Sequence, residues 1–292
     1  MNRFKLGRAM RNLSQHRDVL SINTATFGHR KPIEELIDLC ASRNIGAIAP
    51  WRRDLVDRNI SEVSRRIRSA GLKVSGLCRS TYFPQNTPQA REAALQENMH
   101  AVEIAAEIEA RCYVLVVGGL PENSRDLEGV RQQVKDGVTR LLEHARELRV
   151  PLAFEPLHPM TAADRSCLCT LEQALDWCDE IDPDNCGGLG VAVDVYHVWW
   201  DPKLQQQIAR ACLNERVLGF HVCDWLNPTR DLVMDRGMMG DGVIDLPMIR
   251  NWLEEGGYCG TVEVEIFSAQ NWWKCPEEEV LDTCIERLLS VC

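Results

Sequence analysis

Four side chains able to bind a metal ion each follow a short apolar run in the second half of the chain. They are Glu155, Asp194, His221 and Glu265. The residues on either side of each one are mostly bulky and apolar. Because successive side chains of a strand point to opposite faces, the four polar groups should face away from their apolar neighbours. In neighbouring strands of a closed sheet they would converge.

Such a convergence predicts a metal site. Three carboxylates brought together in a protein interior would repel one another and would be costly to remove from water. A divalent cation removes both costs. A set of two glutamates, one aspartate and one histidine suits Mn²⁺ or Mg²⁺, with Co²⁺, Fe²⁺ and Zn²⁺ as alternatives. Any one of the four alone could be a satisfied polar group at a strand end, but four equivalent positions favour a metal.

The run of residues 261–267 contains Glu263 as well as Glu265, and the two acids are expected to have different roles. Its branched apolar residues alternate with Glu263 and Glu265, so both carboxylates lie on one face of the expected strand. Glu265 is nearer the carboxyl end of the strand, and Glu263 lies one layer deeper. We expect Glu265 to bind the metal, and Glu263 to support the site from below with a buried partner of its own.

A fold that brings these strand ends together is also indicated. Eight short apolar runs alternate with longer amphipathic ones, the pattern of an α/β protein with a (β/α)₈ TIM barrel as one domain over residues 1–292. An open doubly wound sheet is the alternative, but no Gly-x-Gly-x-x-Gly motif follows the first strand. The expected strands are residues 19–27, 45–49, 72–78, 112–117, 151–154, 188–193, 217–220 and 261–267. The expected helices are residues 31–43, 60–70, 88–110, 126–148, 171–181, 203–212, 246–256 and 277–291.

Composition narrows the classes of function. The 292 residues are 45% hydrophobic and carry a formal net charge of −10 without a basic run, so no nucleic-acid partner is expected. Seven histidines and this charge also argue against a multi-metal DNA-repair endonuclease. No apolar stretch has the length of a membrane span or the form of a signal peptide, so no membrane partner is expected. Thirteen scattered cysteines without a Cys-x-x-Cys pair are typical of reduced thiols in a cytoplasmic protein.

The chain resembles the xylose isomerase-like TIM-barrel superfamily of sugar isomerases, epimerases and inosose dehydratase-like enzymes over nearly its whole length. The resemblance rests on residues 154–157 (FEPL), 193–197 (VDVYH), 220–224 (FHVCD), 239–245 (MGDGVID) and 257–260 (GYCG). It implies that Glu155, Asp194, His221 and Glu265 bind one metal, usually manganese. It also implies that the two glutamates act as acid and base on opposite faces of the substrate. The family's ketose 3-epimerases carry a glutamate and an arginine where this chain has Thr161 and Asn227.

The expected activity is metal-dependent proton transfer next to a carbonyl. A metal that holds the carbonyl and a neighbouring hydroxyl makes the adjacent C–H acidic, so that an enediolate can form. Returning the proton through a carboxylate gives an isomerase or epimerase of a sugar, keto-sugar or cyclitol. The alternative is a lyase, in which the enediolate loses a leaving group, as in an inosose or dehydroshikimate dehydratase or in elimination from a 3-keto-glycoside. A non-catalytic barrel subunit is a further alternative.

Other residues near the strand ends are candidates for substrate binding. They are His197, His158, Arg236 and Trp51. His197 follows Asp194 by three residues and resembles a substrate-hydroxyl contact of the family. The alternatives are a structural role for either histidine, a surface salt bridge for the arginine and simple packing for the tryptophan. The tryptophan pairs at 199–200 and 272–273 could form a lid or a contact in a homo-oligomer.

Overall fold

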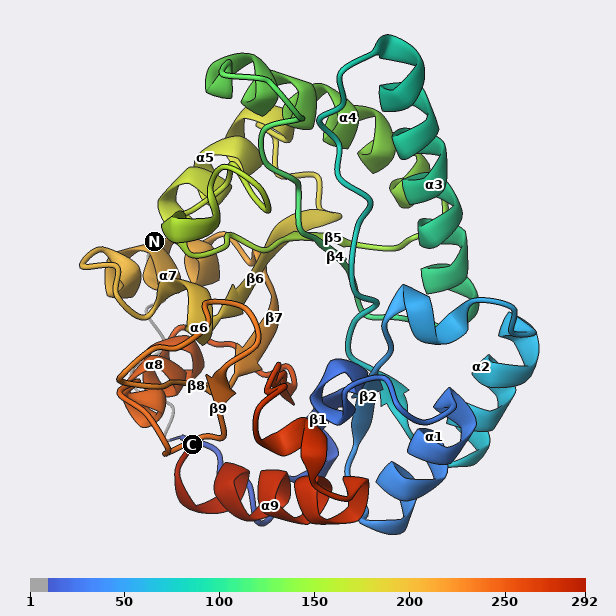
Figure 1. Cartoon of the computed structure of the whole chain (residues 1–292), viewed down its shortest axis with the longest axis vertical. Helices are drawn as coiled ribbons and strands as arrows, with labels where there is room; N and C mark the ends of the chain where they lie inside the picture. The colour runs from blue at the N-terminus through green and yellow to red at the C-terminus, as the bar shows by residue number, and fades with distance from the viewer. Residues whose placement is uncertain (1–9) are drawn as a thin grey trace, which may run out of the picture.

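The barrel expected from the sequence is present in the computed structural model, which describes residues 10–292 (Figure 1). Parallel strands form an 8-stranded sheet in the order β3-β2-β1-β10-β7-β6-β5-β4. Their bounds are β1 Leu20–Asn23, β2 Ala47–Ala49, β3 Lys73–Val74, β4 Tyr113–Leu115, β5 Leu152–Phe154, β6 Leu189–Asp194, β7 Val217–Val222 and β10 Val262–Val264. The two ends of this order meet, because Leu77 bridges Tyr113 and the Val114 N–H donates to the Leu77 carbonyl at 3.0 Å.

Helices surround the sheet as an outer ring (Figure 1). Their bounds are α1 Ile33–Ser42, α2 Ile60–Ser69, α3 Pro88–Glu107, α4 Leu127–Glu147, α5 Leu171–Ile181, α6 Val195–Val198, α7 Leu204–Leu213, α8 Leu246–Glu255 and α9 Glu277–Ser290. Every strand of the barrel is followed by at least one of them. The order of elements confirms the predicted α/β (β/α)₈ TIM barrel.

The regular strands are shorter than the apolar runs that predict them. The run at 72–78 contains only β3, and the run at 261–267 contains only β10. Beyond β3 only isolated backbone hydrogen bonds join the chain to the neighbouring strands. One of them runs from the Cys78 N–H to the Pro50 carbonyl at 3.0 Å. The apolar runs therefore identify the strands correctly, but they overestimate how far the continuous ladders extend.

The barrel has apolar packing outside the sheet and smaller side chains inside it. The helices bury their apolar faces against the strands, and Leu36, Val138 and Leu175 are fully buried there. A separate cluster inside the barrel is built from Cys78, Cys112, Val114, Ala153 and Ala192. Because these side chains are small, the barrel interior also has room for buried polar groups such as Asn23 and Glu263.

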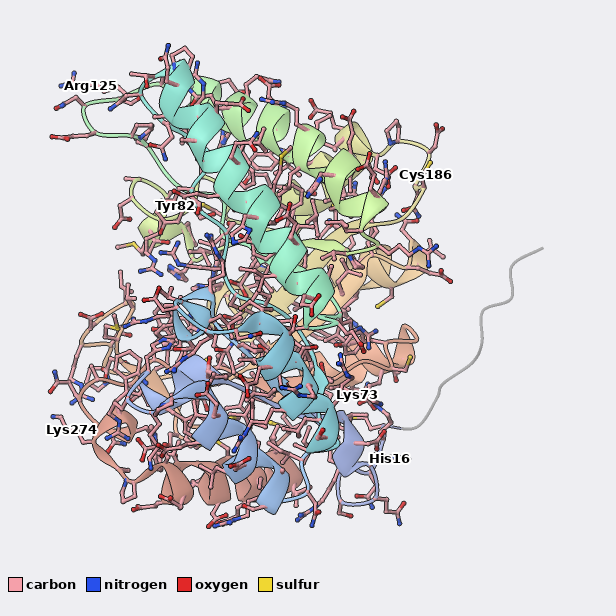
Figure 2. The ribbon with its side chains drawn as sticks, turned by 90° about the vertical axis from the view of Figure 1, so that its right-hand side faces the viewer. His16, Lys73, Tyr82, Arg125, Cys186 and Lys274 are labelled. Atoms are coloured by element: carbon pink, nitrogen blue, oxygen red, sulfur yellow. The ribbon has the colours of Figure 1, made fainter. Side chains whose placement is uncertain are left out.

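The two ends of the barrel carry different residues. In Figure 2, Tyr82, Arg125 and Lys274 lie toward one edge, and they belong to the loops that follow β3, β4 and β10. His16 and Lys73 lie toward the opposite edge, near the beginnings of strands. The first edge is therefore the carboxyl end of the barrel, where active sites of this fold are found.

A short hairpin at this end was not predicted. It pairs β8 Asp224–Trp225 with β9 Arg236–Gly237 in the connection between β7 and α8. Strands of two residues are too short to give an alternating sequence pattern, so the segment reads only as a charge-rich loop. Separately, none of the described helices is long and apolar enough to cross a membrane.

Candidate metal centre

The four predicted side chains meet inside the carboxyl end of the barrel. Each of Glu155, Asp194, His221 and Glu265 is buried and offers one ligand atom, and these atoms all lie within 4.8 Å of one another. The predicted convergence is therefore confirmed. A cluster of this size and composition could hold one metal ion, because three carboxylate oxygens and one imidazole nitrogen are suitable donors for a divalent cation.

The barrel strands set the height of these side chains. Asp194 ends β6, and its register partner is His221 of β7, which itself lies next to Glu263 of β10. Glu155 directly follows β5, and its N–H donates to the Leu115 carbonyl at 3.1 Å. The ladder hydrogen bonds thus fix Glu155, Asp194 and His221 at the carboxyl end of the barrel, as the alternation of side chains predicts.

Glu265 lies one residue beyond regular strand and is held by bonds to β7 and to the helical turn that follows β1. Its N–H donates to the Val222 carbonyl at 3.1 Å. The Thr26 hydroxyl donates to the Val264 carbonyl and accepts from the Ile266 N–H, both at 3.1 Å. These bonds secure the backbone on both sides of the carboxylate without a continuous ladder.

Burial and neighbouring charges shift the pKa values of three residues of the cluster. Burial, with the nearby charge of Glu155, raises the pKa of Glu265 to about 8. Burial alone would also raise the pKa of Asp194, but the charges of Arg236 and His221 hold it below its ordinary value. Burial alone would lower the pKa of His221, yet Glu263 and Glu155 raise it well above the ordinary value. A bound cation would relieve the repulsion that these shifts reveal.

Glu263 occupies the layer below the cluster, as predicted. One of its oxygens accepts from the Asn23 amide at 2.9 Å, and the other accepts from the Ser75 hydroxyl at 2.7 Å. The first oxygen also lies 3.7 Å from Nε2 of His221, whose Nδ1 is 2.8 Å from Glu155. The contact with Glu263 turns Nδ1 toward the cluster, where loss of its proton would make a lone pair available to a cation.

Arg236 is not in a surface salt bridge but lies inside the site. The β8–β9 hairpin carries it inward, and its Nη1 lies 3.0 Å from Asp194 and 3.3 Å from Glu265. Its Nε is buried and has no hydrogen-bond partner among the described residues. Burial alone would lower the pKa of Arg236, but Asp194 and Glu265 raise it, so the guanidinium remains charged.

The two candidate histidines differ in position. His197 is buried, and its Nδ1 accepts from the His158 N–H at 3.1 Å, which leaves Nε2 facing Arg236 Nη2 at 3.1 Å. Burial lowers the pKa of His197 to about 3, so its imidazole is neutral. His158 is half-buried and packs against Trp225 with ring centroids 4.8 Å apart. His197 thus faces the cluster, whereas His158 contributes to the aromatic wall beside it.

Trp51 follows β2 on the other side of the site. Its ring packs edge-on against Phe267 at 5.4 Å, and its Nε1 is buried without a partner among the described residues. It lines a small enclosed cavity together with Glu155, His197, Arg236 and Glu265. Four of the predicted site residues therefore share one cavity with Trp51.

Several residues of the site were missed by the sequence analysis. Arg165, Phe267 and Cys78 line the same cavity, and Asn23 and Ser75 bind Glu263. For Asn23 and Ser75, the one available signal was a small polar residue at an inward position of an early strand. The tryptophan pairs are partly buried and pack on the chain itself, as when Trp273 Nε1 donates to the Ala25 carbonyl at 2.8 Å.

Comparisons with known proteins place these features in a wider group. The sequence profile of the xylose isomerase-like TIM barrel family matches residues 37–290. An inosose isomerase of Bacillus velezensis is 23% identical over 284 residues, which cover 93% of this chain and 96% of that protein.

Solved structures show the same fold. A protein of Sinorhizobium meliloti is 51% identical, with a TM-score of 0.91 over 94% of this chain and 99% of that one. The IolI protein, whose crystal structure contains a zinc atom, is 21% identical, with a TM-score of 0.80 over 93% of this chain and 97% of that one. At that level of identity the second likeness concerns the fold alone.

Proposed function

This chain belongs to the xylose isomerase-like TIM barrel family, and from that premise we propose that it is a divalent-metal-dependent isomerase or epimerase of a cyclitol or keto-sugar. The observation that carries the proposal is the buried cluster of three carboxylates and one imidazole within 4.8 Å. The similarity to an inosose isomerase along almost the whole chain supports a cyclitol-like ketone as the substrate class.

We assign the four residues of the cluster as the metal ligands. Glu155, Asp194, Glu265 and Nδ1 of His221 would hold the ion, and Glu263 would fix the imidazole from below. The donor set suits manganese best, while the zinc atom in IolI keeps zinc as an alternative. When bound, the cation would polarise a substrate carbonyl and make the neighbouring C–H acidic.

We assign proton transfer to the two glutamates. In the sheet order, β5 and β10 flank β6 and β7, so Glu155 and Glu265 approach a ligand in the mouth from different sides. One carboxylate removes the proton next to the carbonyl, and the other returns a proton to the opposite face or to the neighbouring carbon. This division of roles gives epimerisation or isomerisation.

Neighbouring residues would orient the substrate. The unpaired Nε of Arg236 can donate to a substrate oxygen. The neutral His197 would bind a substrate hydroxyl through Nε2 in place of its contact with Arg236 Nη2. Trp51 offers an apolar face opposite the acids. His158 contributes to the wall through its contact with Trp225. We also propose a cytoplasmic location, since all thirteen cysteines are free thiols.

Solvent exchange tests this function directly. The protein, loaded with Mn²⁺, is incubated in D₂O with 2-keto-myo-inositol, with a series of ketohexoses and with their phosphate and uronate derivatives, and proton NMR follows the loss of the C–H signal next to the carbonyl. We expect exchange that stops on chelation and proceeds without a new near-ultraviolet chromophore. A growing enone absorbance would show elimination and hence the lyase alternative. Absence of exchange with every ketone would contradict the proposal.

A further inference from the structure

We propose that the substrate carries an anionic group, a carboxylate or a phosphate, remote from its reacting ketone, and that Arg79 and Arg52 bind that group. That the bound ligand is a substrate rests on the proposed function. The anion-binding site itself does not depend on the reaction. It concerns the part of the mouth formed by the loops after β2 and β3.

The site is a cavity of about 460 Å³ at the carboxyl end of these two strands. Its polar lining consists mainly of Arg52, Arg53, Arg79, Ser80, Thr81 and Gln85. Trp51, Cys78 and Arg79 also line the enclosed cavity that contains Glu155 and Glu265. Arg79 therefore borders both cavities, and we infer that a ligand bound at the acids extends past it into the larger cavity.

Several of the arginines that line these cavities have no carboxylate partner in the described part of the chain. The chain has a net charge of −10, and many of its arginines lie within 4.0 Å of a carboxylate. Among the described residues, no carboxylate lies within that distance of Arg79, Arg52, Arg53 or Arg165. Arg165 lines the enclosed cavity, and the other three line the larger one. An uncompensated cationic lining is thus concentrated beside the acids of the cluster.

Aromatic rings hold the side chain of Arg79 through its guanidinium plane. Its guanidinium lies 4.7 Å from the Tyr82 ring centroid and 6.0 Å from that of Trp51. These contacts orient the planar group, and its N–H donors have no hydrogen-bond acceptor among the described residues. Tyr82 belongs to the loop edge of the barrel that is visible in Figure 2.

Arg52 is also held by neutral partners. Its Nη1 donates to the Thr81 hydroxyl at 2.8 Å and reaches the Tyr113 hydroxyl at 3.5 Å. The Thr81 hydroxyl in turn donates to Glu97, so that acid orients Thr81 instead of pairing with the arginine. Two half-buried guanidinium groups with planar, oriented donors suit the oxygens of a carboxylate or phosphate.

A calorimetric comparison of matched ligands tests the inference. Mn²⁺-loaded wild type is titrated with D-fructose, D-fructose 6-phosphate, a keto-hexuronate and inorganic phosphate. The same titrations are made with Arg79→Gln, with Arg52→Gln in case the first variant fails to fold, and with Arg125→Gln as the control. Arg125 is exposed on the same edge of the barrel, and no carboxylate lies within 4.0 Å of it among the described residues (Figure 2).

We expect wild type to bind at least one anionic ketose about tenfold or more tightly than fructose. Arg79→Gln should remove most of this preference, and Arg125→Gln should keep it. The phosphate and uronate arms show which anion the site prefers. The inference is overturned if wild type binds neither phosphate nor an anionic ketose better than fructose, or if the preference persists in the Arg79 and Arg52 variants.

These outcomes are separable from failure of the proposed function. Calorimetry reports binding without turnover, whereas the exchange experiment reports proton transfer. An arginine-dependent preference without exchange on any ketone would leave the anion site standing and contradict the proposed reaction. Exchange on neutral ketones without any preference for anionic ligands would support the proposed reaction and contradict the anion site.

Discussion

The two halves of the barrel contribute to the same mouth in different ways. The last four barrel strands, β5, β6, β7 and β10, supply all four residues of the acidic cluster. The first four strands, β1–β4, supply none of them, but the loops after β2 and β3 carry the arginine-lined cavity. One half concentrates negative charge in the interior, and the other places positive charge at the entrance.

The difference lies also in how the side chains are positioned. The acids stand within or directly after regular strands, where backbone hydrogen bonds to the neighbouring strands fix their positions. The arginines stand on irregular backbone and are held by aromatic rings and hydroxyls. Reaction chemistry needs the first kind of precision, whereas recognition of a substrate end tolerates the second. We therefore expect changes in the two halves to have different kinetic signatures.

The largest effect should come from removing one acid of the cluster. Glu155→Gln keeps the shape of the side chain but removes its basicity, so turnover should fall roughly 10³-fold or more. The rate of solvent deuterium exchange measures the change, and circular dichroism checks the fold. Glu286→Gln, an exposed change in α9, serves as the control. A Glu155 variant that exchanges at the wild-type rate would remove this residue from the mechanism.

A smaller effect is expected one layer below. Glu263→Gln should weaken metal affinity roughly 10- to 100-fold, because the acceptor that orients His221 loses its charge. An amide nitrogen would also face the donors of Asn23 or Ser75. Titration with Mn²⁺ measures the affinity. Unchanged affinity, together with unchanged thermal stability, would show that this acid supports neither the site nor the fold.

The first half of the barrel should respond differently. Trp51→Ala should raise KM roughly tenfold through loss of an aromatic contact, while metal affinity stays at the wild-type value. Trp51→Phe should recover part of the loss, because it restores a ring at the same place. Steady-state kinetics and metal titration together give the comparison. A large fall in metal affinity in the alanine variant would contradict the separation of roles between the two halves.

The acidic cluster could be predicted from the sequence because it depends on local rules. Glu155, Asp194 and His221 each stand at or near the end of an apolar run, and the closed barrel turns such positions inward. The same alternation separates Glu265 from Glu263 by one layer, and both locations agree with the structure. The eight strands were also found, although their ends were not.

Other parts of the site depend on tertiary contacts that no local pattern reveals. Arg236 reaches Asp194, 42 positions earlier in the chain, only because the β8–β9 hairpin folds it into the mouth. The partners of Glu263 come from β1 and from the residues just after β3. The cavity beside Arg79 is formed by loops, whose conformation is not set by hydrophobic periodicity.

Metal stoichiometry tests the central claim most directly. Purified protein is stripped of metal by chelation and titrated with Mn²⁺, with free ion followed by electron paramagnetic resonance, for wild type, Glu265→Gln and Trp51→Ala. We predict one tightly bound ion per chain in wild type and in the tryptophan variant. In the glutamate variant the affinity for Mn²⁺ should fall about 100-fold or more. Wild-type protein that binds no ion, or a Glu265 variant that binds as wild type does, would contradict the account.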